Sequence, residues 1–268
     1  MVAMIVGLGT LVGFDSAANM AEEAKDPFRT VPRAIVGSVA AAGVLGLLFL
    51  IALTYSITSI PEVTAAESPV AAIMRDQLGP VTERLFLAVI AIAFFGGGLV
   101  TLTSCSRTIF AMARDSRFPA HKLMRRVDGR TQTPIPATIL PVVIGIAALA
   151  LMPGDALMEL ITAATVFPAL TYGGIVVLYL VVRKRLDHRE GGFSLGRFET
   201  PVAYAALIWS ICALIVLLSP SSIVSIVLVV GLLALGGLYF AYMMIANREI
   251  LETEPGDDAF AEAPEVTT

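Results

Sequence analysis

Charged residues are scarce in this chain. Asp, Glu, Lys and Arg make up 15% of its 268 residues, whereas 57% are hydrophobic, and the mean hydropathy is +0.84. A soluble domain carries roughly a quarter charged residues, so this composition excludes a water-soluble enzyme. The net charge of −4 provides none of the basic excess that a nucleic acid attracts. We therefore expect no nucleic-acid partner.

Residues that bind metals or form disulfides are also few. The two histidines, His121 and His188, lie in basic loops without a neighbouring cysteine or second histidine, so no metal site is expected. The two cysteines, Cys105 and Cys212, fall inside apolar segments and cannot build the disulfide framework of a secreted protein. The apolar segments contain no Ser–His pair, acidic dyad or metal cluster. The sequence thus predicts neither an enzyme nor a cofactor.

Long uncharged runs, in contrast, are frequent. About 20 helical residues cross the ~30 Å hydrocarbon core of a bilayer. Six runs have about this length, namely Ala34–Ile57, Leu85–Ser106, Ile135–Pro153, Leu160–Val182, Pro201–Pro220 and Ser221–Ala246. A seventh, Met1–Phe14, is interrupted by Asp15 and continued by apolar residues to Lys25. We expect an all-α fold, a polytopic membrane helical bundle of about seven helices over residues 1–246. Residues 247–268 are acidic and predict a disordered tail.

Lys and Arg are distributed unevenly among the loops between these runs. Sixteen of the 18 fall in alternate connections, which the positive-inside rule assigns to the cytoplasm. Arg75 and Arg84 fall on the other side. We therefore expect loops 107–134 and 183–200 and the C-terminus to be cytoplasmic, and loop 58–84 to be external. On this assignment Met1 begins outside, which predicts that further segments precede it.

The first segment combines a glycine with helix-capping residues at membrane depth. Gly13 permits backbone conformations that other residues avoid, and Asp15 and Ser16 are favourable helix N-caps. Irregular backbone at this depth survives only where it lines a cavity, and broken helices hold substrates in many secondary transporters. A half-helix starting here would direct free N–H groups at an anionic group such as a carboxylate.

Two other interpretations of this segment stay open. Met1–Phe14 would be a frayed chain end if Asp15 marked the water interface. Alternatively, Asp15 is a helix cap without a role in substrate or ion handling, although an acid at membrane depth favours a functional role.

Two stretches resemble a known family. Residues 13–35, GFDSAANMAEEAKDPFRTVPRAI, resemble the sixth-helix signature of bacterial amino acid permeases in the amino acid–polyamine–organocation (APC) superfamily. Residues 106–119, SRTIFAMARDSRFP, and 133–137, TPIPA, resemble the eighth helix and following loop. The resemblance implies a leucine-transporter-like inverted-repeat fold, of which this chain supplies helices six to twelve: the second repeat plus two further helices.

The same resemblance implies which residues bind substrate. Gly13, Phe14, Asp15 and Ser16 match the unwound region of the sixth helix, where the family contacts its substrate. They would form half of a site. The other half would lie in a first repeat of five helices outside these 268 residues.

Hydroxyl groups of the third run are candidates for ion coupling. Hydroxyls on the eighth helix of this fold contribute to a cation site, which points to Thr103 and Ser104. Helix–helix packing is the alternative role for both residues.

Charged residues on the cytoplasmic side are candidates for a gate. Glu22 and Glu23 end the first segment, while Arg107 and Arg114 leave the third, seven residues apart and so on one helix face. An ion pair between the two groups would form a cytoplasmic gate. Solvated charges at the ends of the spans are the alternative.

These features predict a secondary transporter of the bacterial cytoplasmic membrane that carries an amino acid or related amine. Because the sequence has no ATP-binding loop, a gradient of H⁺ or Na⁺ would drive uptake. The alternative is a non-transporting membrane protein, either a truncated permease remnant or an assembly partner. The expected partners are the lipid bilayer and either an N-terminal five-helix repeat or a second copy of the chain.

Overall fold

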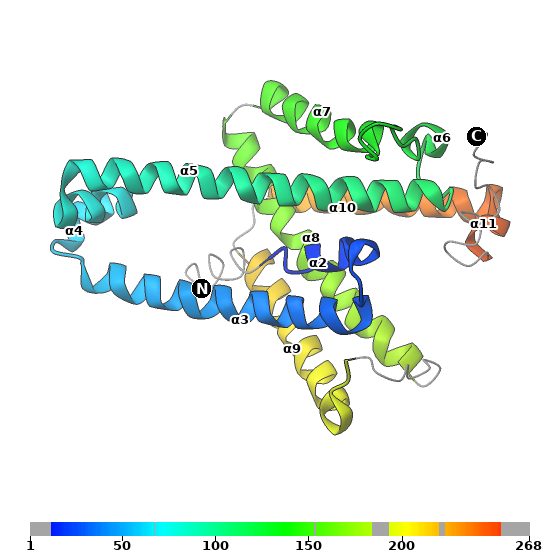
Figure 1. The fold of residues 1–268 in the computed structure, drawn as a ribbon, viewed down its shortest axis with the longest axis horizontal. Coiled ribbons are helices and arrows are strands. Elements are labelled where there is room, and N and C mark those ends of the chain that lie inside the picture. Colours follow the sequence, from blue (N-terminus) through cyan, green and yellow to red (C-terminus); the bar gives the residue numbers. More distant parts are fainter. Residues whose placement is uncertain (1–11, 67, 153, 184–192, 220–222, 253–268) are drawn as a thin grey trace.

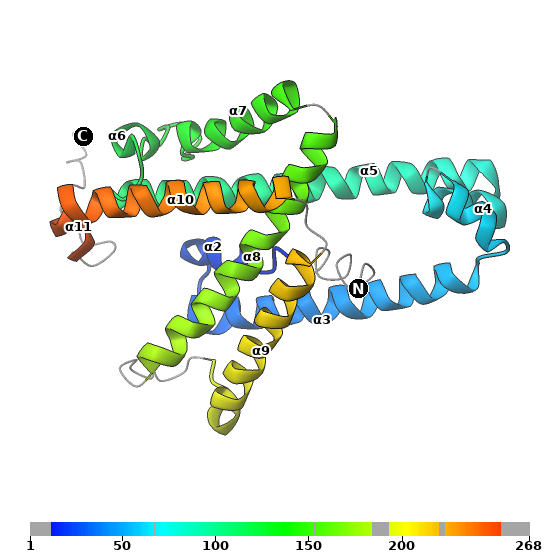
Figure 2. The same cartoon turned by 180° about the vertical axis from the view of Figure 1, so that it is seen from behind.

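The computed structural model describes residues 12–66, 68–152, 154–183, 193–219 and 223–252. Every regular element in these ranges is a helix (Figure 1, Figure 2). The long helices are α3 (Pro27–Tyr55), α5 (Pro69–Arg114), α7 (Ile135–Leu151), α8 (Gly154–Val182), α9 (Glu199–Leu218) and α10 (Ile223–Ala246). The short ones are α2 (Ser16–Asn19), η1 (Ala21–Glu23), α4 (Ile60–Ala65), α6 (His121–Met124), η3 (Gly196–Phe198) and α11 (Arg248–Glu252). The predicted all-α fold is confirmed.

The long helices correspond to the six uncharged runs. Five of them are long and apolar enough to cross a membrane, and α7 is a shorter apolar helix of 17 residues. Large apolar side chains such as Leu45, Ile92 and Leu235 are exposed on their surfaces, which suits a hydrocarbon solvent rather than water. The prediction of a polytopic membrane bundle is therefore confirmed. The seventh predicted span falls largely on residues 1–11, outside the described residues.

Helix α3 begins at Pro27, seven residues before its uncharged run. Proline fits the first helical position, where a backbone N–H would have no helical partner. Pro32, farther along, has no N–H to donate to the carbonyl of Phe28, four residues before it. That carbonyl instead accepts a hydrogen bond from the backbone N–H of Phe193, with an N···O distance of 3.2 Å. The bond ties α3 to the segment that leads into α9.

Helix α5 is 46 residues long and is bent near its start. Gly79 has φ of 81° and ψ of 170°, a conformation that glycine adopts readily, and Pro80 follows it. A straight helix would separate Arg75 and Glu83 by about 12 Å along its axis. The bend brings them together as an ion pair of 3.3 Å. The first part of α5, together with α4, also makes much of the predicted external loop 58–84 helical.

Helix α8 packs against both α9 and α10. A small apolar cluster of Ala163, Val166, Leu217 and Val229 forms the buried core of this group. Gly173 of α8 lies close to α9, since a Cβ atom at this position would be 3.4 Å from the Cβ of Ser210. Small residues of this kind allow membrane helices to approach closely.

Helices α3 and α5 run antiparallel from their connection at α4 (Figure 1). Near α4, the Thr58 hydroxyl donates to the Asp76 carboxylate over 2.8 Å. At the opposite end, the short helix α2 contacts both α3 and α5. The segment that carries the predicted substrate residues is thus held between two long helices.

Candidate functional site

A turn at Gly13 begins the candidate site. Gly13 has φ of 85°, a value that other residues rarely adopt, and its carbonyl accepts a hydrogen bond from the N–H of Ser16 over 3.1 Å. Helix α2 starts directly afterwards, at Ser16, and the Asp15 carbonyl accepts the N–H of Ala18 over 2.8 Å. The half-helix predicted before this turn lies outside the described residues, apart from Val12.

The side chain of Asp15 is turned toward α8. Asp15 occupies the N-cap position of α2, yet its carboxylate makes no capping hydrogen bond. It accepts one from the hydroxyl of Tyr172, with an Oη···Oδ1 distance of 2.7 Å. The Phe14 ring lies against the same tyrosine, with ring centroids 4.7 Å apart and planes inclined at 30°. Tyr172 therefore holds two consecutive residues of the turn, and the carboxylate has a tertiary partner instead of a cap.

A cavity of about 340 Å³ lies on the α3 side of the same turn. Gly13, Phe14 and Ser16 line one wall of this cavity. Ala34 and Ser38 belong to the wall that α3 supplies. The structure thus separates the four predicted substrate residues: three line this cavity, while the Asp15 carboxylate lies against α8.

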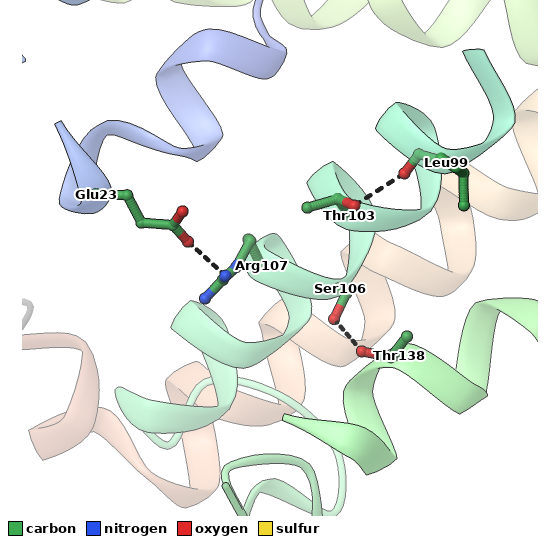
Figure 3. Close-up of polar contacts among 6 residues, drawn as sticks. All are labelled: Glu23, Leu99, Thr103, Ser106, Arg107 and Thr138. Atoms are coloured by element: carbon green, nitrogen blue, oxygen red, sulfur yellow. Dashed lines mark hydrogen bonds and ion pairs between the residues drawn. The ribbon is translucent and has the colours of Figure 1, made fainter. Parts of the chain in front are cut away.

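The two predicted ion-coupling hydroxyls have different neighbours. Thr103 donates to the carbonyl of Leu99 on its own helix over 2.9 Å (Figure 3). Ser104 accepts a hydrogen bond from the side-chain amide of Asn19 in α2. Thr103 and Ser104 are consecutive on α5, so they lie on different faces of that helix, and no described contact brings them together at one ion.

One of the predicted gate pairs is present. Arg107 of α5 forms an ion pair with Glu23 at the end of η1 (Figure 3). The side chains are partly exposed, 33% for Arg107 and 55% for Glu23. Arg114 lies against Asp115, its neighbour in the chain, at 3.4 Å. The side chain of Glu22 lies outside the described residues.

Comparison with known proteins identifies the family. A family model described as amino acid permease matches residues 1–229. The chain belongs to the amino acid permease family. The predicted resemblance to the APC superfamily, based on residues 13–35, 106–119 and 133–137, is thereby confirmed. The permease is an integral membrane protein, and the prediction that it is no enzyme is confirmed by relatives that are permeases and transporters.

Several curated relatives match most of the permease chain. The GABA-specific permease of Saccharomyces cerevisiae is 29% identical over 95% of this chain and 47% of its own length. The choline transporter of the same yeast is 27% identical over 96% of this chain and 48% of its length. The amino-acid permease BAT1 of Arabidopsis thaliana is 27% identical over 75% of this chain and 41% of its length. The chain thus spans less than half the length of these relatives. No solved structure matches it.

Two contacts of the permease were not predicted from its sequence. Tyr172 contacts the turn from 157 residues away, and Asn19 reaches Ser104 from 85 residues away. Each is a polar side chain in or beside an apolar segment, a feature that marks helix contacts and functional sites in membranes. Asn19 is also four residues after Asp15, on the same side of the segment. A polar residue in an apolar segment thus points to Tyr172 and Asn19, but it does not reveal which residues they contact.

Proposed function

We propose that the protein containing this chain carries an amino acid or a related amine across the membrane by secondary active transport, driven by H⁺ or Na⁺. The carrying observation is the turn at Gly13–Ser16, where a glycine in a positive-φ conformation and an aromatic ring line a cavity, and the carboxylate of the next residue, Asp15, lies against Tyr172 of α8. Irregular backbone in a membrane protein occurs where it lines a cavity. Secondary transporters use such breaks in their helices to bind substrates, which supports a substrate site at this turn.

The Asp15 carboxylate favours a substrate with a cationic nitrogen. A carboxylate and an aromatic ring are the two groups that attract an ammonium ion most strongly in proteins. Asp15 and Phe14 provide both, in consecutive positions. The relatives named for γ-aminobutyrate and for choline carry molecules that share a cationic nitrogen. We therefore assign the amine of the substrate to this turn.

The other wall of the site would come from outside these residues. The chain spans 41–48% of the three relatives' lengths, and alternating access in such folds uses two repeats around a shared site. We propose that an N-terminal five-helix repeat, or a second copy of the chain, covers the exposed faces of α3 and α5. The bilayer covers the remaining apolar surface.

The charge distribution supports an orientation for the permease. Because loops rich in Lys and Arg stay in the cytoplasm, we propose that loops 107–134 and 183–200 and the C-terminus are cytoplasmic, and that the membrane is a bacterial cytoplasmic membrane. The check is labelling of single introduced cysteines in intact cells, after replacement of Cys105 and Cys212. A cysteine at Thr64 should react with an impermeant reagent and one at Thr131 should not. The reverse pattern would invert the proposed topology.

Uptake into proteoliposomes tests the proposed function directly. The protein made from the complete reading frame that contains this chain is reconstituted, and uptake of labelled γ-aminobutyrate, L-alanine, choline and putrescine is measured under imposed H⁺ or Na⁺ gradients. We expect saturable, gradient-dependent accumulation of at least one probe. Accumulation of none of them would leave the non-transporting alternative.

A substitution at Asp15 tests the site. Asp15→Asn keeps an acceptor for the Tyr172 hydroxyl but removes the negative charge that would bind the amine. A hydrogen bond to a charged group contributes about 1.5–3 kcal/mol, so the ratio of maximal rate to KM should fall by about tenfold or more. Glu62→Gln, at an exposed acid of α4, is the matched control and should transport normally. Unchanged transport per molecule in Asp15→Asn would remove Asp15 from the site.

A further inference from the structure

A second cavity, of about 460 Å³, lies between the α2–η1 segment and α5. Its volume is within the range of about 300–1,000 Å³ that small-molecule sites occupy. The walls combine opposite charges, hydrogen-bonding groups and apolar surface, supplied by Asn19, Glu23, Arg107, Thr108, Phe110 and Met112. None of these residues lines the cavity beside Gly13.

Polar side chains recur between the Gly13 turn and this cavity. Asp15, Asn19 and Glu23 are spaced four residues apart in the chain, with α2 ending at Asn19 and the 3-10 helix η1 ending at Glu23. Each contacts another helix: Asp15 contacts Tyr172, Asn19 contacts Ser104, and Glu23 contacts Arg107. Ser104 and Arg107 are three residues apart and share a face of α5. Asn19 and Glu23, four and eight residues after Asp15, line the second cavity, which therefore follows the turn directly along the chain.

The ion pair has the chemistry to bind a zwitterion. An arginine guanidinium matches a carboxylate with two parallel hydrogen bonds, and a glutamate carboxylate accepts the N–H groups of an ammonium ion. Glu23 and Arg107 are both partly exposed, and exposed ion pairs hold their side chains weakly. The two side chains can therefore separate and bind a ligand with the opposite charge at each end.

We infer that this cavity is a second binding site for a zwitterionic substrate, on the path between the Gly13–Ser16 turn and the aqueous phase. Arg107 binds the carboxylate of the substrate and Glu23 binds its ammonium group, so that the substrate replaces the ion pair. Its carbon chain lies against Phe110 and Met112. This inference rests on the proposed transport function and adds to it that the substrate carries a carboxylate.

The test separates this binding role from a purely structural ion pair. In proteoliposomes of known orientation, KM and maximal rate are measured for the accumulated probes from each side of the membrane. Arg107→Gln should raise the KM of γ-aminobutyrate or L-alanine about tenfold on the side of loop 107–134, with the KM on the opposite side changed less than twofold. Arg107→Lys keeps the positive charge and should recover part of the affinity. Arg126→Gln, an exposed arginine in the same loop, is the control and should match the unaltered protein.

Two outcomes would contradict this inference. An equal fall in maximal rate from both sides, with KM unchanged, would show that the ion pair is only structural. Accumulation of choline or putrescine without either amino acid would contradict the zwitterion while leaving the proposed transport function intact. Size-exclusion profiles establish that the variants fold. If Arg107→Gln aggregates, Arg107→Lys is compared with the unaltered protein in its place.

Discussion

Two regions of the permease differ in how much apolar packing holds them. Helices α8, α9 and α10 meet through a small apolar core and a close contact at Gly173, to which hydrogen bonds such as Arg183–Thr200 and Ser225–Glu159 are added. Residues 13–23 are held to α5 and α8 by three polar contacts, made by Asp15, Asn19 and Glu23. Packed cores resist displacement in any direction, whereas a few directional bonds exchange partners readily. We therefore expect the first region to act as a rigid frame and residues 13–23, which carry the proposed substrate contacts, to move against it.

The largest effect is expected from a substitution that disrupts the packing of α8 against α9. Gly173→Leu places a side chain against Ser210, and overpacking of this kind costs about 1–3 kcal/mol. We expect lower thermal stability and less monodisperse protein, measured by fluorescence-detected size-exclusion after heating. Gly174→Leu is the matched control, because nothing lies within 4 Å of a Cβ atom at that position. Equal losses in both variants would argue against close packing of α8 on α9.

A smaller effect should follow from a change in the polar region. Tyr172→Phe keeps the ring beside Phe14 and removes the hydroxyl that donates to Asp15. Asp15 is half-buried, so water replaces part of the lost bond, and we expect a stability loss of about 0.5–1.5 kcal/mol. Uptake should fall about tenfold, and thermal stability should fall less than in Gly173→Leu. A fall in stability as large as that of Gly173→Leu would place Tyr172 in the frame instead.

The sequence predicted the positions of several helices closely. The uncharged runs Ile135–Pro153, Pro201–Pro220 and Ser221–Ala246 differ by only a few residues from α7, α9 and α10, because bilayer thickness sets the length of an apolar helix. The starts of α3 and α5 were placed too late. A charged residue ends an uncharged run, but it does not end a helix, and both helices continue through several arginines.

Partners across the fold were predicted less well than helices. The pair Glu23–Arg107 was among the predicted contacts because both charges flank spans on one side. Arg114 contacts Asp115, its neighbour at the end of α5. The contact of Tyr172 with Asp15 depends on how α8 crosses the bundle (Figure 2), and no periodicity within either segment encodes that crossing.

The smallest expected effect concerns the loop between α6 and α7. Hydrogen bonds from the backbone N–H of Thr131, and from its hydroxyl, hold the pKa of the Asp128 carboxyl below its ordinary value. Because the folded-state pKa is lowered, the stabilisation is complete above the ordinary pKa and is lost as pH falls through the lowered one. Asp128→Asn should therefore flatten a slight decline in thermal stability at acid pH. An unchanged acid decline would exclude Asp128 as its source.

Distance measurements between spin labels test most directly whether residues 13–23 move while α8, α9 and α10 stay packed together. In the complete protein with Cys105 and Cys212 replaced, one label pair joins Lys25 to Lys122, and a second joins the exposed residues Leu178 of α8 and Ile208 of α9. Adding whichever probe the protein accumulates, with the gradient that drives it, should shift the distance distribution of the first pair and leave the second unchanged. A first pair that stays fixed, or a second pair that moves as much, would contradict a mobile polar segment on a packed frame.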